Sequence, residues 1–308
     1  MLKVLHRVVS WFDNAVVEFS PDATDNSIDW LRVIPFVGLH LACFAVIWVE
    51  ASWFSVIFAV ALYAIRMFAI TGFYHRYFSH KSFQTTRVTQ FIFALLGNTA
   101  VQRGPLWWAA HHRNHHVHSD KLSDQHSPVQ HGFLWSHMGW FLARDNFATR
   151  LDRVKELATF PELRFLDRFD IIVPIVFAVS IFILGDWLES TAPQLNTNGW
   201  QLFIWGFVIS TIALYHGTFT VNSLAHVWGK RRYATRDHSR NNWFIAIITL
   251  GEGWHNNHHH YPGAAKQGFY WWEFDFTYYG LKLMAACGMI WNLRTVPIEI
   301  RESQKEKL

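Results

Sequence analysis

Residues 53–80 read WFSVIFAVALYAIRMFAITGFYHRYFSH and join an apolar run to a histidine-rich segment. From Trp53 to Phe73 the run holds a single charged residue, Arg66. It can cross the hydrocarbon core of a bilayer, which takes about 20 helical residues. This stretch therefore predicts a membrane helix that delivers polar side chains to one membrane surface.

Three further apolar runs, 33–49, 169–185 and 200–219, lie in a chain of 308 residues that is 51% hydrophobic and 16% charged. We expect an all-α integral membrane protein with four transmembrane helices in two hairpins. The hairpin linkers, 50–52 and 186–199, contain no Lys or Arg. The positive-inside rule then places both termini and both large polar segments in the cytoplasm.

The pattern indicates one domain in which membrane and polar parts alternate. Segment 1–30 shows no signal-peptide pattern and is expected in the cytoplasm or along the membrane surface. The remaining parts are a first hairpin at about 31–73, a cytosolic cap at 74–168, a second hairpin at about 169–221, and further cap and tail at 222–308. Two shorter apolar runs, 91–101 and 278–291, are expected at the interface or packed in the cap.

Eleven of the 19 histidines fall in three windows that together hold 20 residues. The windows are HRYFSH at 75–80, HHRNHHVH at 111–118 and HNNHHH at 255–260. Spacing of i, i+3 and i+4 occurs in the second window and again in the third, at His112, His115 and His116 and at His255, His258 and His259. On a helix these offsets share one face, which favours a common purpose for each trio.

The other histidine candidates also leave the membrane on the predicted cytoplasmic side. A turn could aim His75 and His80 at one point, and His226 follows Asn222 by four residues in NSLAH. Nine imidazoles are too many for one ion, whereas two metals with four or five imidazoles each would account for them. Iron would link the site to oxygen chemistry, but affinity alone favours zinc over ferrous iron, so ligand type leaves the metal open.

Single histidines are expected to be hydrogen-bonded or solvated, and those that flank the windows out of register are expected to be incidental or to support the ligands. The first group is His6, His40, His126, His131, His137, His216 and His238, and the second is His111, His118 and His260.

Beyond the histidines, several longer strings resemble the membrane fatty acyl desaturases, specifically the stearoyl-CoA and acyl-lipid Δ9 type. They are ITGFYHRYFSHKSF at 70–83, WAAHHRNHH at 108–116, SDQHSP, GFLWSHMGW, NSLAHVWG at 222–229 and GEGWHNNHHHYP at 251–262. The resemblance covers about residues 30–295 and its combined motifs are highly specific.

This resemblance implies two iron ions, dioxygen as co-substrate, and a cis double bond placed at position 9 of a saturated acyl chain on CoA or a lipid. The ligands it implies are His75, His80, His112, His115, His116, His226, His255, His258 and His259, with Asn222 acting through water. It names no catalytic residue besides these. It also implies a mushroom-like fold whose cytosolic cap carries the metals, with a bent tunnel for the acyl chain.

Further residues are candidates for supporting roles. Asp120, Asp124 and Glu252 lie close to the histidine windows and could fix the imidazole orientations, although surface charge or helix capping explains them equally well. The basic cluster Lys230, Arg231, Arg232 and Arg236 could hold the phosphates of CoA or a lipid head group, or be an ordinary positive-inside flank. For the tunnel floor we expect residues 60–67.

The partners expected are the acyl substrate, membrane lipids and an electron donor. No haem-binding signature is fused to the chain, so we expect a separate donor: a ferredoxin, a rubredoxin or a b-type cytochrome with its reductase. A net charge of +4 is too modest to suggest nucleic acid. Two alternatives remain: a membrane hydroxylase with the same type of site, and a non-enzymatic membrane metal-binding protein.

Overall fold

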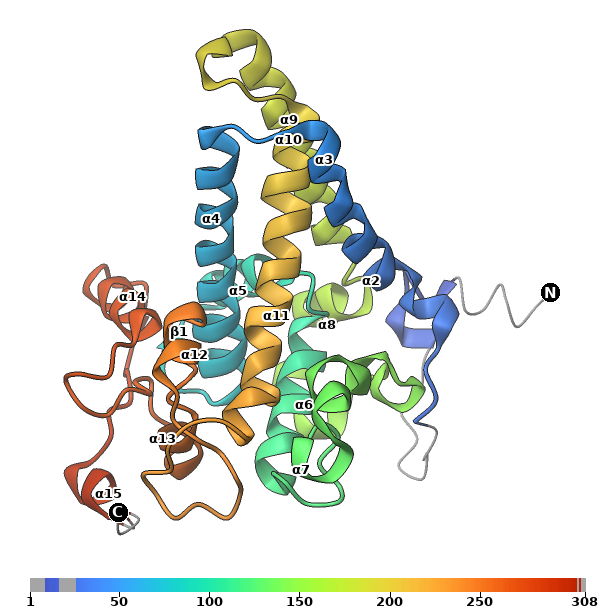
Figure 1. Cartoon of the computed structure of the whole chain (residues 1–308). Coiled ribbons are helices and arrows are strands. Elements are labelled where there is room, and N and C mark those ends of the chain that lie inside the picture. Colours follow the sequence, from blue (N-terminus) through green and yellow to red (C-terminus); the bar gives the residue numbers. More distant parts are fainter. Residues whose placement is uncertain (1–8, 17–25, 304, 306–308) are drawn as a thin grey trace.

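Four long apolar helices stand side by side and carry a broad cap at one end (Figure 1). The structure is a computed structural model that describes residues 9–16, 26–303 and 305. Each helix has the length and composition to cross a membrane: Trp30–Val49, Trp53–Ser79, Ile172–Thr191 and Gly199–His226. The four predicted spans are thereby confirmed, while most of segment 1–30 before Asn26 lies outside the described residues.

The first hairpin turns at the predicted short linker. Its first arm runs through α2 (Trp30–Ala42), η2 (Cys43–Ala45) and α3 (Val46–Val49). The second arm is α4 (Trp53–Phe68), which continues as the π-helix η3 (Ala69–Ser79). Ser52 and Ser55 cap α4 reciprocally, because each side-chain oxygen accepts a hydrogen bond from the other residue's backbone N–H, so the helix begins sharply.

The second hairpin is longer than its apolar runs predict. Its first arm is α9 (Ile172–Thr191), and its second is α10 (Gly199–Leu202), η10 (Phe203–Ile209), α11 (Ser210–Asn222) and η11 (Leu224–His226). Residues 186–191, predicted as linker, are helical, and the loop keeps only the short η9 (Pro193–Leu195). Apolarity marks the part of a helix that meets lipid, whereas polar turns extend it beyond the bilayer.

The spans differ in how much protein covers them. Only 11% of the apolar window of the first span is buried, against 61% for the fourth, which α4 contacts along its length. Large side chains such as Trp48 and Trp53 are therefore exposed, at 76% and 86%. Lipid must cover these surfaces, as a membrane-spanning bundle requires.

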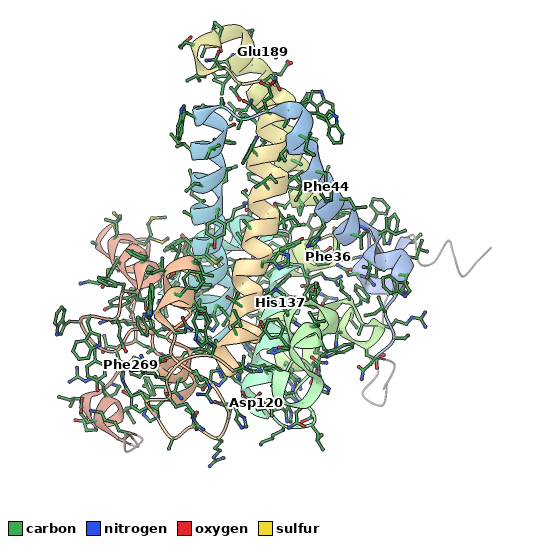
Figure 2. All side chains as sticks on the ribbon, viewed as in Figure 1. Phe36, Phe44, Asp120, His137, Glu189 and Phe269 are labelled. Carbon is green, nitrogen blue, oxygen red and sulfur yellow. The ribbon has the colours of Figure 1, made fainter. Side chains whose placement is uncertain are left out.

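The cap is built from helices that pack around the ends of the second and fourth spans (Figure 1). Glu189 lies at the opposite end of the molecule (Figure 2). The longer helices of the cap are α5 (Arg87–Asn98), α6 (Pro105–His118), α8 (Pro161–Arg168) and α14 (Phe276–Ala286). Its short helices are α7 (Pro128–His131), α12 (Trp243–Ile248), α13 (His255–His260) and α15 (Ile298–Glu302).

Irregular pieces complete the chain. They are η1 (Asn14–Val16), η4 (Trp135–Gly139), η5 (Trp140–Leu142), η6 (Arg144–Asn146), η7 (Leu151–Arg153) and η8 (Leu157–Thr159). One antiparallel pair, β1 (Gln84–Thr85) with β2 (Ile290–Trp291), ties the start of the cap to its end. The two short apolar runs form α5 and α14, neither long enough to span.

A buried arginine fixes the second span to the C-terminal part of the cap. Arg76 in η3 is 1% exposed, and its guanidinium lies 3.0 Å from Glu252 Oε1 and 2.9 Å from Asp275 Oδ1. It also donates to the Ala265 carbonyl at 2.7 Å. Because a buried charge without partners is costly, these contacts hold the helix end in one position.

Gly185 and Gly199 let the arms of the second hairpin approach closely. A Cβ on Gly185 would lie 2.5 Å from the Asn198 carbonyl oxygen, a backbone atom that cannot yield cheaply. Gly185→Val should therefore destabilise the protein by about 1–3 kcal/mol through overpacking. Gly38→Val, at a helical site with nothing within 4 Å, is the matched control. Thermal unfolding in detergent measures both, and equal melting temperatures would contradict this packing.

Candidate metal centre

Five histidines from three elements meet beneath the second span. His75 lies in η3 and His80 just after it, His112 and His116 lie in α6, and His258 lies in α13. One ring nitrogen from each falls within 4.8 Å of all the others. We call this group cluster 1.

The Nε2 atoms of cluster 1 form a chain of close contacts. The distances are 3.1 Å for His75 to His258, 2.9 Å for His258 to His116, 3.0 Å for His116 to His112 and 2.8 Å for His112 to His80. A neutral Nε2 carries either one hydrogen or one lone pair, so it can join in one hydrogen bond. Five such atoms make at most two bonds for these four contacts. A cation shared by inward-facing lone pairs satisfies all of them.

A second group of four histidines lies beside the first and is called cluster 2. It consists of His115 in α6, His226 in η11, and His255 and His259 in α13. The Nε2 atoms of His226 and His255 are 3.1 Å apart. The buried His259 Nε2 has no hydrogen-bond partner among the described residues, as expected of a nitrogen that is free to bind a metal.

The two clusters divide each trio that the spacing predicts to act together. In α6 the pair at i and i+4 joins cluster 1 and His115 joins cluster 2. In α13 the division is reversed, because His255 and His259 join cluster 2 while His258 joins cluster 1. Each of the helices α6 and α13 therefore contributes histidines from one face to both clusters.

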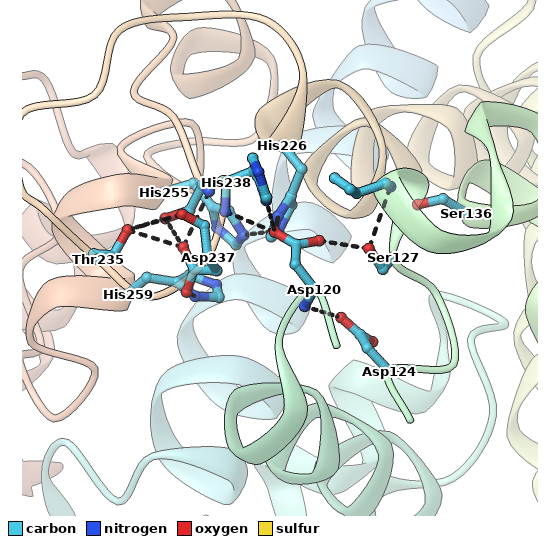
Figure 3. A network of polar contacts seen from close by, with 12 residues as sticks. Asp120, Asp124, Ser127, Ser136, His226, Thr235, Asp237, His238, His255 and His259 are labelled. Carbon is cyan, nitrogen blue, oxygen red and sulfur yellow. Dashed lines mark hydrogen bonds and ion pairs between the residues drawn. The ribbon is translucent and has the colours of Figure 1, made fainter. Parts of the chain in front are cut away.

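Four carboxylates accept hydrogen bonds from the Nδ1 atoms of these imidazoles. Three are the predicted candidates: Glu252 with His75 at 2.5 Å, Asp124 with His115 at 3.0 Å, and Asp120 with His226 at 2.9 Å. The fourth, Asp237 with His259 at 2.7 Å, was missed because it lies in a loop far from any histidine window (Figure 3). With Nδ1 holding the hydrogen, each ring presents an unprotonated Nε2 to its cluster.

Burial favours the neutral form of five imidazoles of the site, whereas contacts with histidines hold the nearby carboxylates in the charged form. Burial lowers the pKa well below 6.5 for His80, His112, His116, His255 and His258. Burial alone would raise the pKa of the carboxylates, but the hydrogen bonds and charges of their histidine partners lower it for Asp120, Asp124, Asp237 and Glu252. Neutral nitrogens are the form that coordinates a metal.

The donor set fits transition metals. Imidazole nitrogens suit zinc, copper, nickel and iron, whereas calcium and magnesium prefer oxygen ligands. Cluster 1 offers five nitrogens and cluster 2 offers four. Asn222 lines the smaller cavity, which histidines of both clusters border.

Histidines outside the clusters have other partners. His111 bonds Gln125, and His260 stacks on Tyr233 with ring centroids 3.9 Å apart. His40, His216 and His137 hydrogen-bond to one another in a row. His6 lies outside the described residues.

His126, expected to be hydrogen-bonded or solvated, lies beside cluster 2, with Nδ1 3.9 Å from Asp124 Oδ1. Its side chain is buried, and Nδ1 has no hydrogen-bond partner among the described residues. It stacks on His115 at 4.2 Å and forms a third group with His115 and Asp124. The motif SDQHSP folds back because Asp124 accepts backbone N–H groups of Asp120 and His126.

Two cavities meet beside cluster 1. The larger, of about 230 Å³, runs from a polar end at Asn14, Arg32, Arg103 and Asp170 to His112 of cluster 1. The smaller continues past the clusters to Met67, Ile70 and Thr71. Trp108, His112, Thr218 and Asn222 line both.

The cavities differ from two sequence expectations. Of the floor expected at residues 60–67, only Met67 lines a cavity, and Val60 instead is 63% exposed. None of the basic residues Lys230, Arg231, Arg232 and Arg236 lines either cavity. Arg232 is engaged by the carboxylate of Glu273 and by Asn257.

Comparison with known proteins gives one consistent family. Residues 51–288 match the family model described as Fatty acid desaturase. The chain is 36% identical over 275 residues to a sn-1 stearoyl-lipid 9-desaturase of Anabaena variabilis, covering 88% of this chain and 96% of that protein. It is 38% identical over 218 residues to a sn-2 palmitoyl-lipid 9-desaturase of Nostoc sp., covering 70% and 72%. It is also 35% identical over 281 residues to an Acyl-CoA C20 Delta5-desaturase of Anemone leveillei, covering 90% and 85%.

Removing the carboxylate that orients a cluster imidazole should weaken metal binding. Asp237→Asn keeps the size of the side chain but can present an amide N–H to His259, and we expect a loss of about 10- to 100-fold in metal affinity. Asp152→Asn is the control, because that side chain is 52% exposed and forms ion pairs with Arg150 and Arg153, which belong to neither cluster. Metal content after dialysis against graded chelator measures the effect; equal retention by both variants would contradict the assigned role.

Proposed function

The chain belongs to the fatty acid desaturase family, and on this premise we propose that it introduces a cis double bond at position 9 of a saturated acyl chain. It is a membrane oxidoreductase that acts as a fatty acyl desaturase. The observation that carries the proposal is the meeting of two histidine clusters with the junction of two apolar cavities.

We assign iron to both clusters and dioxygen as the co-substrate. Nine histidines would hold the two ions: His75, His80, His112, His116 and His258 one, and His115, His226, His255 and His259 the other, with Asn222 acting through water. Iron bound there would supply the oxygen activation that removal of hydrogen from an unactivated methylene pair requires. No side chain offers an oxidant of comparable strength.

The protein's own residues position the acyl chain. Phe36, Phe141 and Phe219 wall the larger cavity with aromatic surface and exclude water from it. Beside cluster 1, Trp108 stacks on His112 with ring centroids 5.1 Å apart. Gln102 donates to the Thr218 hydroxyl at 3.0 Å, and this bond fixes the position of two side chains in the cavity wall.

The length of α6 supports position 9. The polar end of the cavity lies at the start of α6, and Pro105 and His112 are seven residues apart, about 10 Å along the helix. About eight extended carbon–carbon bonds of roughly 1.5 Å each cover that distance in a zigzag. An acyl group whose linkage lies near Arg103 would therefore bring its ninth carbon to cluster 1.

For the acyl carrier we propose a membrane lipid, with CoA as the alternative. Two relatives are named as lipid desaturases and one as an acyl-CoA desaturase. Arg32 and Arg103 at the polar end can donate to the carbonyl or phosphate oxygens of either carrier. We further propose that the cap lies on the cytoplasmic side, since the loops at the opposite end lack Lys and Arg. A separate protein supplies the electrons.

Loss of one cluster 1 ligand should abolish the reaction. Expression of His112→Ala in a host that lacks monounsaturated lipids should leave its acyl chains saturated, whereas the intact chain should produce a species lighter by two hydrogens. His118→Ala is the control and should remain active, because His118 belongs to neither cluster and lies one turn after His115 on α6. Mass spectrometry of total lipids reads the outcome. A gain of one oxygen would indicate a hydroxylase and contradict the proposal.

The far end of the smaller cavity should limit chain length. Met67→Trp fills space at that end, so the ratio of stearoyl- to palmitoyl-derived products should fall by about tenfold or more. Val60→Trp lies two turns earlier on α4 with its side chain outside both cavities, and it should leave the ratio unchanged. The fatty acid profile of the same host gives the measurement. An unaltered ratio in Met67→Trp would place the end of the acyl chain elsewhere.

A further inference from the structure

One buried carboxylate beside cluster 2 contacts a side chain at the surface of the cap. Asp120 Oδ2 accepts from His226 Nδ1 at 2.9 Å and from the backbone N–H of His238 at 2.7 Å. The same oxygen lies 3.4 Å from His238 Nδ1, and the His238 side chain is 51% exposed (Figure 3). A surface imidazole is thus joined through one buried carboxylate to a cluster 2 histidine.

The other three carboxylates have no such link. Glu252 contacts buried Arg76 and Gln267, Asp124 contacts buried His126, and Asp237 contacts Ser239 and Thr235. Within the described residues, His238 is therefore the exposed side chain that approaches a carboxylate oxygen of the centre. The contact between Asp120 and His226 is enough to orient the His226 ring, and the contact with His238 is not needed for that purpose.

The surface around His238 is basic. Asp120 lies at the end of the cap opposite the membrane helices (Figure 2). We define the distal face as the residues near Asp120 and His238 in sequence or in contacts, which are Lys121, Leu122, Arg153, Arg236 and His238. Lys121 and Arg236 are exposed. Leu122, next to Lys121, is 85% exposed and offers an apolar contact within the basic rim. Asp152 lies against Arg150 and Arg153 and offsets only part of this charge.

We propose that an acidic one-electron carrier protein docks on the distal face and passes electrons to the metal centre through His238, Asp120 and His226. This rests on the proposed function, which requires two electrons from outside. Each docking oxidises the carrier by one electron. Two dockings, with two protons from solvent, let one dioxygen and one saturated carbon pair become two waters and one double bond.

The charge and geometry suit a transient carrier. Attraction between opposite charges raises the rate of association and favours an acidic partner, while the complex can still dissociate quickly. This attraction weakens as the salt concentration rises. Redox encounters use small interfaces, and exposed Leu122 together with the cations of the distal face offers a contact of mixed apolar and charged character. Docking here also keeps the carrier off the membrane, where the spans expose apolar side chains to lipid.

Binding tests the docking site without any turnover. The double variant Lys121→Glu, Arg236→Glu should bind an acidic [2Fe–2S] ferredoxin at least about tenfold more weakly than the unaltered chain at low salt. The unaltered complex itself should weaken as salt rises, and basic cytochrome c should not bind. Lys282→Glu, an exposed lysine on α14, is the matched control and should bind as the unaltered chain does. If the double variant binds no more weakly than Lys282→Glu, the distal face is not the docking site.

A second variant tests the route. His238→Ala should bind ferredoxin within about twofold of the unaltered chain but be reduced by it at least about fivefold more slowly, while reduction by dithionite stays unchanged. Equal rates of reduction by ferredoxin would overturn the route. Dithionite-reduced, iron-loaded protein tests the proposed function separately. If the dithionite-reduced protein forms product but the double variant binds ferredoxin as well as the unaltered chain does, the docking site is refuted and the proposed function stands. If the dithionite-reduced protein forms no product, the proposed function is refuted.

Discussion

The structure depends on holding the imidazole nitrogens of nine histidines close together in two clusters. Lone pairs at the separations found in cluster 1 repel one another unless a cation lies among them, and nothing in the protein's own hydrogen bonding can satisfy all the contacts. The four carboxylates make this arrangement possible, since each accepts a hydrogen bond from the Nδ1 of one ring and so directs the other nitrogen of that ring inward. Those carboxylates must in turn be buried and paired, which is why the surrounding cap is rich in buried polar side chains.

The membrane helices serve this constraint by extending beyond the bilayer. The second span continues as η3 to carry His75 into the cap, and the fourth continues as η11 to carry His226. The first span does neither; it is mostly exposed and contributes Arg32, Pro35 and Phe36 to the cavity wall. A substrate with an apolar chain and a polar linkage can thus lie with its chain between the helices and its linkage at the membrane surface.

Local features of the sequence predicted the parts of the fold that local physics determines. Apolar length fixed the number of spans, and the spacing of histidines identified the residues that converge. Helix bounds were less certain, because residues 186–191 are polar yet helical. The division of each trio between two clusters could not be read from helical spacing, since His115 and His116 differ only in which neighbour faces them in the folded cap. Asp237, the buried position of His126 and the end of the cavity at Met67 depend on contacts between segments far apart in sequence.

The central claim is that two iron ions lie in the cap, one in each cluster. Anomalous X-ray scattering from crystals of the iron-loaded protein, recorded on both sides of the iron absorption edge, tests it most directly. The account predicts two peaks, one surrounded by His75, His80, His112, His116 and His258 and the other by His115, His226, His255 and His259. A single peak, or scattering characteristic of another metal at both positions, would contradict it.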